Sequence, residues 1–453
     1  MIALSIQQLA EILHATLVGV IDPAMMVRDV STDTRKIVPQ SVFFALTGER
    51  FDGHNYVEQA IDSGASVAVV SRRIANGLPQ LVVNDVLKAL GQFAHWNRRQ
   101  VNTRVVALTG SSGKTSVKEM TAAILKNLGQ TRYTQGNLNN DIGVPLTLLA
   151  LQPDDKYAVI ELGANHIGEI AYTTELTGSE SVLVNNIAAA HLEGFGSLAG
   201  VAKAKGEIFI GLPASGGKAL LNYDSYSPEW LAGLKQHQVY FFSLQSDQAD
   251  YFASDIVESG SQTTFTLHTP ETHFLVRLPL IGRHNVSNAI AAAALAMSVG
   301  ATVNQVVEGL SHLTPVKGRL FPIILNQSQR IFDDTYNANV GSMSAAINVL
   351  ADQPGYRIFV VGDMGELGQD AVACHQQIGE LAKAAGIDLV LSFGHLSQHI
   401  SAATAEGQHF TDKAALVEIL KTMIKIHPSL TILVKGSRSM RMEQVIEPLI
   451  KHE

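Results

Sequence analysis

Residues 104–116 read RVVALTGSSGKTS, a run of β-branched and apolar residues followed at once by a glycine-bracketed turn that ends in Lys114 and Thr115. A strand, a glycine-rich turn and a helix in this order are typical of a loop that cradles phosphate groups. Glycines let backbone N–H groups face the phosphates, the lysine neutralises the β and γ oxygens, and the threonine hydroxyl can hold Mg²⁺. The stretch predicts a nucleotide triphosphate site in an α/β domain.

The match to the usual pattern G-x-x-x-x-G-K-[ST] is imperfect at its first position. That position is Leu108, and the first glycine of the turn, Gly110, comes two residues later. The residues of the turn still have the strand before them and the helix after them that the function requires, so the phosphate-loop interpretation is favoured over a chance match.

The overall composition is that of an ordinary folded protein and excludes several classes. A length of 453 residues predicts about three domains at roughly 150 residues each. A net charge of −8 argues against a polynucleotide partner, because nucleic-acid binders usually carry a basic face. The single cysteine, Cys374, excludes an internal disulfide and any CxxC metal site.

The N-terminal segment MIALSIQQLAEILHA has no basic region and predicts a helix, with Ser5 and Gln8 as a capping box, rather than a signal peptide. The longest apolar run, residues 289–297, is about half of what a membrane span requires. We therefore expect a cytoplasmic protein without stable membrane insertion.

The order of apolar segments predicts an α/β fold with three domains. Residues 1–84 predict a small α/β domain, and residues 85–314 predict a P-loop domain with a mainly parallel sheet. Within the second domain, the segments VYFFS, TTFTLHT and HFLVRLPL near 239–280 predict an antiparallel subsheet. Residues 315–453 alternate strands and helices as a Rossmann-like, doubly wound domain does.

Polar residues follow three strands of the predicted C-terminal domain, at the edge where open α/β sheets bind ligands. They include Asp334 and Asn337 after one strand, and Lys435 and Arg438 after the last. The glycines of VVGDMGELG, residues 360–368, have the wrong spacing for a dinucleotide turn, so NAD is not predicted.

Three further segments of the central domain carry candidate chemistry. Glu161 ends the strand YAVIELG and is a candidate Mg²⁺ ligand beside the phosphate loop. His191 follows an apolar run, where a metal or phosphate contact and a structural role are both open. Lys203 and Lys205 in GVAKAKGEIF, by spacing alone, indicate a pair of surface lysines.

The ordered segments TGSSGKTS, ELGAN, HLEGFG, AKAKGEIF, GRHNVSNA, KGRL and DDTYNAN resemble the Mur ligase family. STDTRKIVPQSVFFALTGERFDGH resembles that family's uridine-diphosphate-binding domain, so the resemblance covers essentially the whole chain. GNLNNDIGVP and GDMGELG resemble the members that add the terminal dipeptide. Members often continue NANP where this chain has Val340, a difference in loop stiffness rather than chemistry.

The resemblance implies a role for each candidate residue. The family's shortened loop has no glycine at Leu108, which removes the misfit. It implies catalytic roles for Lys114, Glu161, His191 and Lys205, and Mg²⁺ ligation by Thr115, Glu161 and His191. Relatives carbamylate one lysine of AKAKGEIF; alignment favours Lys205 and leaves Lys203 open.

The remaining implied contacts fall into two sets. Those to ATP come from Thr109, Gly110, Ser111, Ser112, Gly113, Lys114, Thr115, Ser116, Asn285, Asn288, Arg319 and Asp334. Those to the other substrates come from Thr34, Arg35, Arg50, Asn137, Asn140, Asn337, Lys435 and Arg438.

The implied activity is an ADP-forming, ATP- and Mg²⁺-dependent ligase of peptidoglycan biosynthesis that joins D-alanyl-D-alanine to UDP-N-acetylmuramoyl-tripeptide through an acyl phosphate. The domains 1–84, 85–314 and 315–453 would bind the UDP-muramyl-peptide, ATP and the incoming dipeptide, in a monomer. The alternatives are another Mur-type or folylpolyglutamate-type amino-acid ligase and, from a different class, a P-loop switch ATPase. The third peptide residue, diaminopimelate or lysine, is left open.

Overall fold

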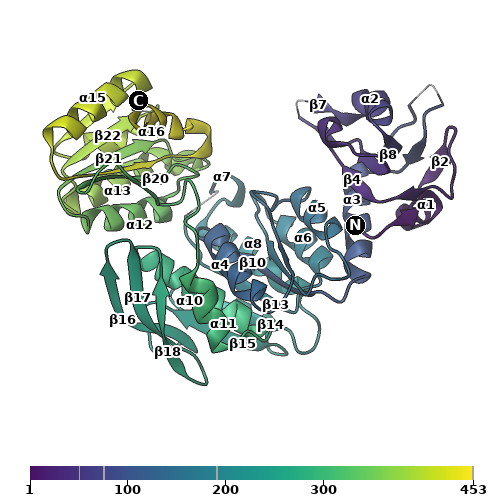
Figure 1. The fold of residues 1–453 in the computed structure, drawn as a ribbon, viewed down its shortest axis with the longest axis horizontal. Coiled ribbons are helices and arrows are strands. Elements are labelled where there is room, and N and C mark those ends of the chain that lie inside the picture. Colours follow the sequence, from purple (N-terminus) through teal and green to yellow (C-terminus); the bar gives the residue numbers. More distant parts are fainter. Residues whose placement is uncertain (50, 75–76, 190–191, 451–453) are drawn as a thin grey trace.

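The chain forms three bodies, each built on its own sheet, in a computed structural model that describes residues 1–49, 51–74, 77–189 and 192–450. In Figure 1 the N-terminal body lies at the right, the central body at the bottom and the C-terminal body at the upper left. His191 and Arg50 lie outside the described residues. The fold is α/β throughout, as the alternation of segments predicts.

The N-terminal body is a five-stranded sheet in the order β2-β9-β8-β5-β4, parallel except for β2, which runs antiparallel to β9. The capping box predicted at Ser5 and Gln8 is present at the start of α1. The loops after β4, β5 and β8 leave the same edge of the sheet, because these strands are parallel. The elements are β1 (Leu4–Ser5), α1 (Ile6–Leu13), β2 (Thr16–Val18), β3 (Met26–Val27), β4 (Asp29–Ser31), β5 (Ser41–Phe44), β6 (Thr47–Gly48), β7 (Phe51–Asp52), α2 (Val57–Asp62), β8 (Ala65–Val70), β9 (Gln80–Val82) and α3 (Val86–Arg99).

The central body is a nine-stranded sheet in the order β11-β12-β10-β13-β14-β15-β16-β17-β18. Strand β10 (Arg104–Thr109), which carries the opening stretch of sequence, pairs in parallel with β12 (Tyr157–Glu161) and β13 (Ser181–Val184). The other strands of the central sheet are β11 (Thr131–Tyr133), β14 (Lys218–Asn222), β15 (Gln238–Ser243), β16 (Tyr251–Ser259), β17 (Gln262–His268) and β18 (His273–Leu278). The mainly parallel sheet with an antiparallel subsheet is confirmed.

One part of the predicted subsheet is wrong. The segment VYFFS forms β15, which pairs in parallel with β14 and with β16 rather than antiparallel. The antiparallel ribbon consists of β16, β17 and β18. The short helix α9 (Trp230–Gly233) lies between β14 and β15 and makes this connection a crossover, which keeps the strands parallel.

Two groups of helices cover the faces of the central sheet. The helix α4 (Lys114–Lys126), which follows the phosphate loop, shares an apolar core with α10 (Arg283–Ser298) and α11 (Val303–Ser311). The opposite face packs against α3, α5 (Gly143–Leu149), α6 (Glu169–Thr177) and α8 (Leu198–Gly206). The short helix α7 (Leu192–Phe195) lies between β13 and α8.

The C-terminal body is a six-stranded sheet in the order β19-β20-β24-β21-β22-β23, parallel except for β19. Helices α12 and α13 share a core on one face, and α15 and α16 share a core on the other, as a doubly wound fold requires. The elements are β19 (Phe321–Ile324), β20 (Gln329–Asp334), α12 (Val340–Ala351), β21 (Tyr356–Gly362), α13 (Ala371–Ala384), β22 (Leu389–Phe393), α14 (Gln398–Ala402), β23 (Gly407–Phe410), α15 (Lys413–Ile426), β24 (Leu430–Lys435) and α16 (Glu443–Ile450).

None of the helices in the described part of the chain combines the length and apolar character that a bilayer span requires.

Candidate functional site

The phosphate loop begins only at Gly110, because β10 continues through Leu108 to Thr109. Leu108 is fully buried, and its carbonyl accepts a strand-type hydrogen bond from Leu162 N. A glycine at this position would leave a hole in the core rather than open a loop. The shortened motif is therefore a consequence of the strand's length.

Gly113 gives the loop its final turn and caps α4 in a left-handed conformation, φ 74°. A Cβ atom there would lie 2.5 Å from Asn288 Oδ1 and 2.6 Å from Asn185 Nδ2. Both the backbone angle and the crowding therefore require glycine.

Two asparagines after β13 fasten the loop. Asn186 Oδ1 accepts a hydrogen bond from Ser112 N at 2.9 Å, and Asn185 Nδ2 donates to Ser112 O at 2.9 Å. Ser111 Oγ donates to Ala188 O at 3.0 Å on the same segment. Asn185 and Asn186 are not among the predicted site residues, although their place after a buried strand was the available signal.

Lys114 is the first residue of α4, and its Nζ donates to Gly110 O at 2.7 Å across the loop. Burial lowers the pKa of Lys114 below its ordinary value, and the carboxylate of Glu161 opposes the shift. The ammonium group is thus held over the turn where phosphate oxygens are expected.

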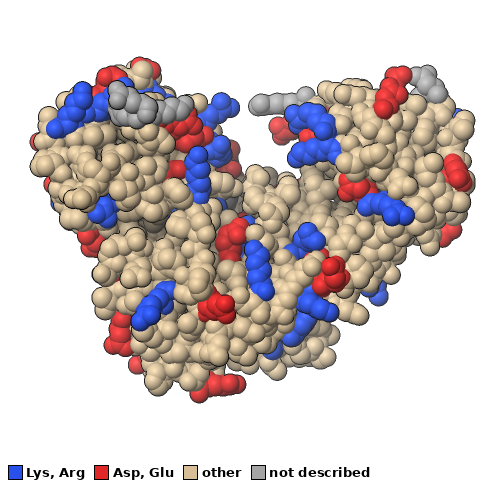
Figure 2. All heavy atoms as spheres, viewed as in Figure 1, with Lys and Arg blue, Asp and Glu red and all other residues tan. Residues whose placement is uncertain are grey.

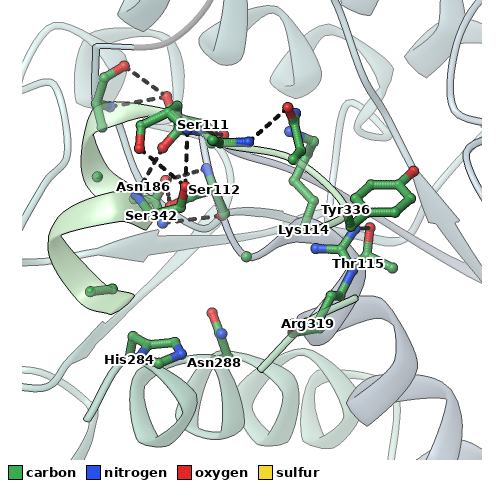
Figure 3. A pocket seen from close by; sticks show the side chains of 18 of the residues that line it. Ser111, Ser112, Lys114, Thr115, Asn186, His284, Asn288, Arg319, Tyr336 and Ser342 are labelled. Carbon is green, nitrogen blue, oxygen red and sulfur yellow. Dashed lines mark hydrogen bonds between the residues drawn. The ribbon is translucent and has the colours of Figure 1, made fainter. Parts of the chain in front are cut away.

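Glu161, at the end of β12, is 2% exposed and lies beside the start of α4. Thr115 Oγ1 donates to its Oε2 at 3.0 Å, and Asn139 Nδ2 donates to its Oε1 at 2.8 Å. Thr115 Oγ1 in turn accepts a hydrogen bond from Arg319 Nη2 at 2.8 Å, as Figure 3 shows. The structure brings the two predicted ligands together and adds Asn139, which is not among the predicted site residues.

The oxygens of Thr115 and Glu161 are hard donors of the kind that Mg²⁺ prefers. Within the described residues, no group of three or more His, Cys, Asp or Glu side chains could hold a metal ion. One carboxylate and one hydroxyl fit a magnesium ion that takes its remaining ligands from phosphates and water.

Lys203 and Lys205 are not the surface pair that their spacing indicates. Lys203 is exposed, but Lys205 is 1% exposed, and its Nζ has no hydrogen-bond partner among the described residues. The ammonium group lies 5.3 Å from the centre of the Phe195 ring. Burial, and then the charge of Lys114, lower the pKa of Lys205 to about 7.

The C-terminal body supplies a second set of charges. Lys435 Nζ, at the end of β24, contacts Asp334 Oδ2 at 2.6 Å and Asn337 O at 2.9 Å. The Arg319 guanidinium lies 4.3 Å from the centre of the Tyr336 ring. Asn339 Nδ2 donates to Ser111 O at 3.3 Å and so links the C-terminal body to the phosphate loop.

The start of α10 contributes three polar side chains. Asn285 Nδ2 donates to Ile281 O at 2.8 Å, and Asn288 Oδ1 accepts from Asn185 Nδ2 at 3.1 Å. Burial and the Lys435 charge lower the pKa of His284 to about 4, so this ring is neutral at pH 7.

The side chains described at the phosphate loop, at Glu161, at the start of α10 and on the C-terminal body mostly line one cavity of about 640 Å³ between the central and C-terminal bodies (Figure 3). The predicted residues that line it are Ser111, Ser112, Gly113, Lys114, Thr115, Ser116, Asn137, Asn140, Glu161, Asn285, Asn288, Arg319, Asp334, Asn337 and Lys435. Asn140 also has a structural role, since its Oδ1 accepts from Gly143 N at the start of α5. A cavity with loop amides, three cationic side chains and a carboxylate–hydroxyl pair can bind a nucleotide phosphate chain.

The other predicted residues that the structure describes lie outside the lining of this cavity. Thr109 is buried and donates to Leu162 O. Gly110 belongs to the turn of the phosphate loop that lies below the Lys114 ammonium group, and its carbonyl accepts from Lys114 Nζ. Arg438 pairs with Glu443 at 3.0 Å. Thr34 and Arg35 belong to the N-terminal body, where Arg35 pairs with Asp33 and its side chain is 84% exposed.

Family models match all three parts of the chain. The Mur ligase family catalytic domain matches residues 27–98, the Mur ligase middle domain residues 108–296, and the Mur ligase glutamate ligase domain residues 318–438.

Similar proteins cover the chain from end to end. It is 56% identical over 450 residues to UDP-N-acetylmuramoyl-tripeptide–D-alanyl-D-alanine ligase of Escherichia coli K12, with 99% of each chain covered. A crystal structure of MurF from Acinetobacter baumannii is 37% identical, covers 100% of both chains and superposes with a TM-score of 0.95. A MurF ligase structure from Thermotoga maritima in complex with ADP is 26% identical, covers 93% of this chain and 96% of its own, and has a TM-score of 0.84.

Proposed function

The chain belongs to the Mur ligase family, and on that premise we propose that it is an ATP-dependent, ADP-forming ligase that joins D-alanyl-D-alanine to UDP-N-acetylmuramoyl-tripeptide. The observation that carries this proposal is 56% identity across 99% of both chains to a ligase with that activity. The product is the pentapeptide precursor of peptidoglycan.

The reaction is amide formation through an acyl phosphate. The terminal carboxylate of the tripeptide attacks the γ-phosphorus of ATP, the bond to the β,γ-bridging oxygen breaks, and ADP leaves. The free amine of D-alanyl-D-alanine then attacks the acyl carbon, loses a proton and expels inorganic phosphate. Phosphorylation therefore converts a poor leaving group into a good one.

The chain's own residues act mainly by position and charge. Lys114, held over Gly110, neutralises phosphate oxygens, and the amides of the loop from Gly110 to Ser116 bind them. Arg319 and Asp334 reach ATP from the C-terminal side, and Asn285 and Asn288 lie at the start of α10 for its adenine end. The closeness of these groups in one cavity supports the assignment.

Mg²⁺ would be held by Thr115 and Glu161, with His191 as a further ligand by family resemblance. When bound, the ion neutralises the phosphate oxygens of ATP. Asn139 fixes the orientation of Glu161 through its hydrogen bond to Oε1. The hard oxygen pair beside Lys114 supports this site.

Lys205 is proposed as the carbamylated lysine. A carbamate forms only on a neutral amine, and burial favours the neutral form of Lys205. Lys203 is exposed and has no comparable environment. The burial difference supports Lys205 over Lys203.

Residues 1–84 are assigned to the UDP-muramyl-peptide, through Thr34, Arg35 and Arg50, residues 85–314 to ATP, and residues 315–453 to D-alanyl-D-alanine, with Asn337, Lys435 and Arg438 near it. Asn137 and Asn140 would contact substrate beside the phosphate loop. We further propose a monomer working in the cytoplasm, the compartment in which ATP is available.

A coupled assay of ADP release tests the proposal. Release should require both UDP-N-acetylmuramoyl-tripeptide and D-alanyl-D-alanine, and mass spectrometry should find the pentapeptide product. Turnover that ignores the dipeptide would indicate a P-loop switch ATPase. Turnover with another amino acid in its place would indicate a sister ligase.

A further inference from the structure

A buried histidine joins two loops of the N-terminal body. His54 follows β7, and its side chain is only 1% exposed. Its Nδ1 lies 2.6 Å from Asp52 Oδ1, and its Nε2 accepts a hydrogen bond from Ser71 N at 2.9 Å. Because a backbone N–H can only donate, Nε2 carries the lone pair and Nδ1 carries the proton that is donated to Asp52.

The Asp52 carboxylate accepts further hydrogen bonds besides the one from the His54 ring. Its Oδ1 also accepts from His54 N at 3.0 Å and Thr47 Oγ1 at 3.2 Å, and its Oδ2 accepts from Arg72 Nη2 at 2.7 Å. These hydrogen bonds, chiefly the one from Arg72, hold the pKa of Asp52 well below its usual range. The carboxylate therefore stays ionised and fixes the guanidinium.

Ser71, His54 and Asp52 have the order of a hydrolase triad, and Ser71 Oγ lies 3.1 Å from His54 Nε2. The backbone N–H of Ser71 already occupies the same nitrogen. That amide is consequently not free to stabilise an oxyanion. The cluster of Asp52, His54, Ser71 and Arg72, called the clamp below, is better suited to holding side chains in place than to supplying a nucleophile.

The clamp lies where the N-terminal sheet can bind a ligand. Ser71 and Arg72 follow β8 directly, and the β6–β7 hairpin follows β5, so both leave the carboxyl edge of parallel strands. In Figure 1 the hairpin lies on the side of the N-terminal body that faces the C-terminal body, and Figure 2 shows an open hollow between the two. The Arg72 side chain remains 55% exposed.

We infer that Arg72 binds the diphosphate of the uridine nucleotide, and that Asp52 and His54 are positioning residues for it. This inference rests on the proposed function, which supplies the uridine nucleotide. An arginine held on one edge by a carboxylate presents its remaining N–H groups in a fixed fork, the geometry that suits phosphate oxygens. The fixed orientation lowers the entropy lost on binding.

Titration calorimetry of the full chain with UDP-N-acetylmuramoyl-tripeptide, without ATP, tests the inference. Arg72→Gln should weaken binding about tenfold to a hundredfold, the range for a lost hydrogen bond to a charged group. Arg73→Gln is the matched control, since Arg73 is adjacent and also exposed, and it should change Kd less than about twofold. Equal losses from Arg72→Gln and Arg73→Gln would overturn the role of Arg72.

Asp52→Asn and His54→Leu test the positioning role. Each should raise KM for the tripeptide nucleotide about fivefold or more, while kcat and KM for ATP stay within about twofold of the wild type. His54→Gln, which keeps one donor and one acceptor, should restore much of the affinity lost in His54→Leu. Wild-type KM in both Asp52→Asn and His54→Leu, or a loss confined to kcat, would overturn the clamp.

Two controls separate the possible failures. ADP binding at wild-type affinity shows that a variant is folded. A wild type that binds the tripeptide nucleotide but turns over without D-alanyl-D-alanine would refute the proposed function and leave the clamp standing. A wild type that binds no uridine nucleotide would refute both.

Discussion

Lys205 is a buried amine whose pKa lies near neutral pH. Burial lowers its pKa to about 7, so the folded protein holds mostly the neutral form at pH 8 and mostly the charged form at pH 6. Carbon dioxide reacts with the neutral amine alone. We expect a carbamate signal in ¹³C NMR after incubation with ¹³C-bicarbonate at pH 8, with the signal falling as the pH drops through 7.

Matched lysine variants assign that signal. Lys205→Ala should lose it, and Lys203→Ala should keep it, because Lys203 is exposed. A signal that survives in Lys205→Ala would place the carbamate elsewhere or show that it is nonspecific.

Asn139 is the residue that orients Glu161 at the proposed metal site. Its Nδ2 donates to Glu161 Oε1, and a Cβ atom on Gly163 would lie 2.9 Å from its amide group, so the side chain is closely packed. Removal of a group that orients a metal ligand costs about tenfold to a hundredfold in metal affinity or activity. We expect Asn139→Ala to raise the Mg²⁺ concentration for half-maximal activity by about that factor.

The neighbouring exposed residue Gln135 offers the control for this measurement. Gln135→Ala should leave the Mg²⁺ dependence unchanged, since its side chain contacts only Tyr133 O among the contacts described. Unchanged Mg²⁺ dependence in Asn139→Ala would mean that Glu161 does not need this partner.

Among the elements, α4 is held in place by a very close approach of α11. A Cβ atom on Gly309 would lie 2.5 Å from Ile124 Cα, a backbone atom that cannot move without shifting α4. Overpacking of this kind costs about 1–3 kcal/mol, more than the roughly 0.5–1 kcal/mol that alanine gains over glycine in a helix. We expect Gly309→Ala to lower the midpoint of thermal unfolding and, because α4 begins with Lys114, to raise KM for ATP.

Gly233→Ala is the control at this scale. Gly233 ends α9, and nothing lies within 4 Å of a Cβ atom placed there. It should leave the unfolding midpoint and KM for ATP near their wild-type values. A Gly309→Ala variant that matches it in both would show that the two helices can separate at little cost.

The helices and strands could be predicted from local sequence. The strands and side chains with which they pair could be predicted less well. Periodicity and the capping box predicted α1, and the strand–turn–helix order predicted β10 and α4. The direction of β15 was wrong because VYFFS has the composition of any buried strand, and its pairing depends on the crossover before it. Burial of Lys205 and the Asn139–Glu161 contact depend on neighbours distant in sequence, which the spacing of residues does not encode.

At the scale of the whole molecule, the assignment of each substrate to a separate body remains a prediction. The architecture makes it testable. The described residues that line the cavity at the phosphate loop, the proposed ATP site, all lie at Ser111 or beyond, so the described part of the N-terminal body contributes none of them. The boundary predicted at residue 84 lies within a continuous apolar core, however: Phe93 of α3 stacks on Phe44 with ring centres 6.4 Å apart, and the same core includes Leu148 and Ile160 of the central body. Separate binding surfaces can therefore sit on bodies that fold together.

Lys114→Ala tests whether those surfaces act separately. Loss of the ammonium group over the phosphate loop should reduce turnover by about a thousandfold, because it removes a preorganised charge from the transferring phosphate. Affinity for UDP-N-acetylmuramoyl-tripeptide, measured by calorimetry without ATP, should stay within about twofold of the wild type, because none of the described residues of the N-terminal body lines the cavity that Lys114 shares. Arg72→Gln should show the converse, weak nucleotide-peptide binding with wild-type affinity for ADP. If Lys114→Ala weakened both ligands equally, the three bodies would act as one binding unit, and the assignment of uridine binding to the N-terminal body alone would be wrong.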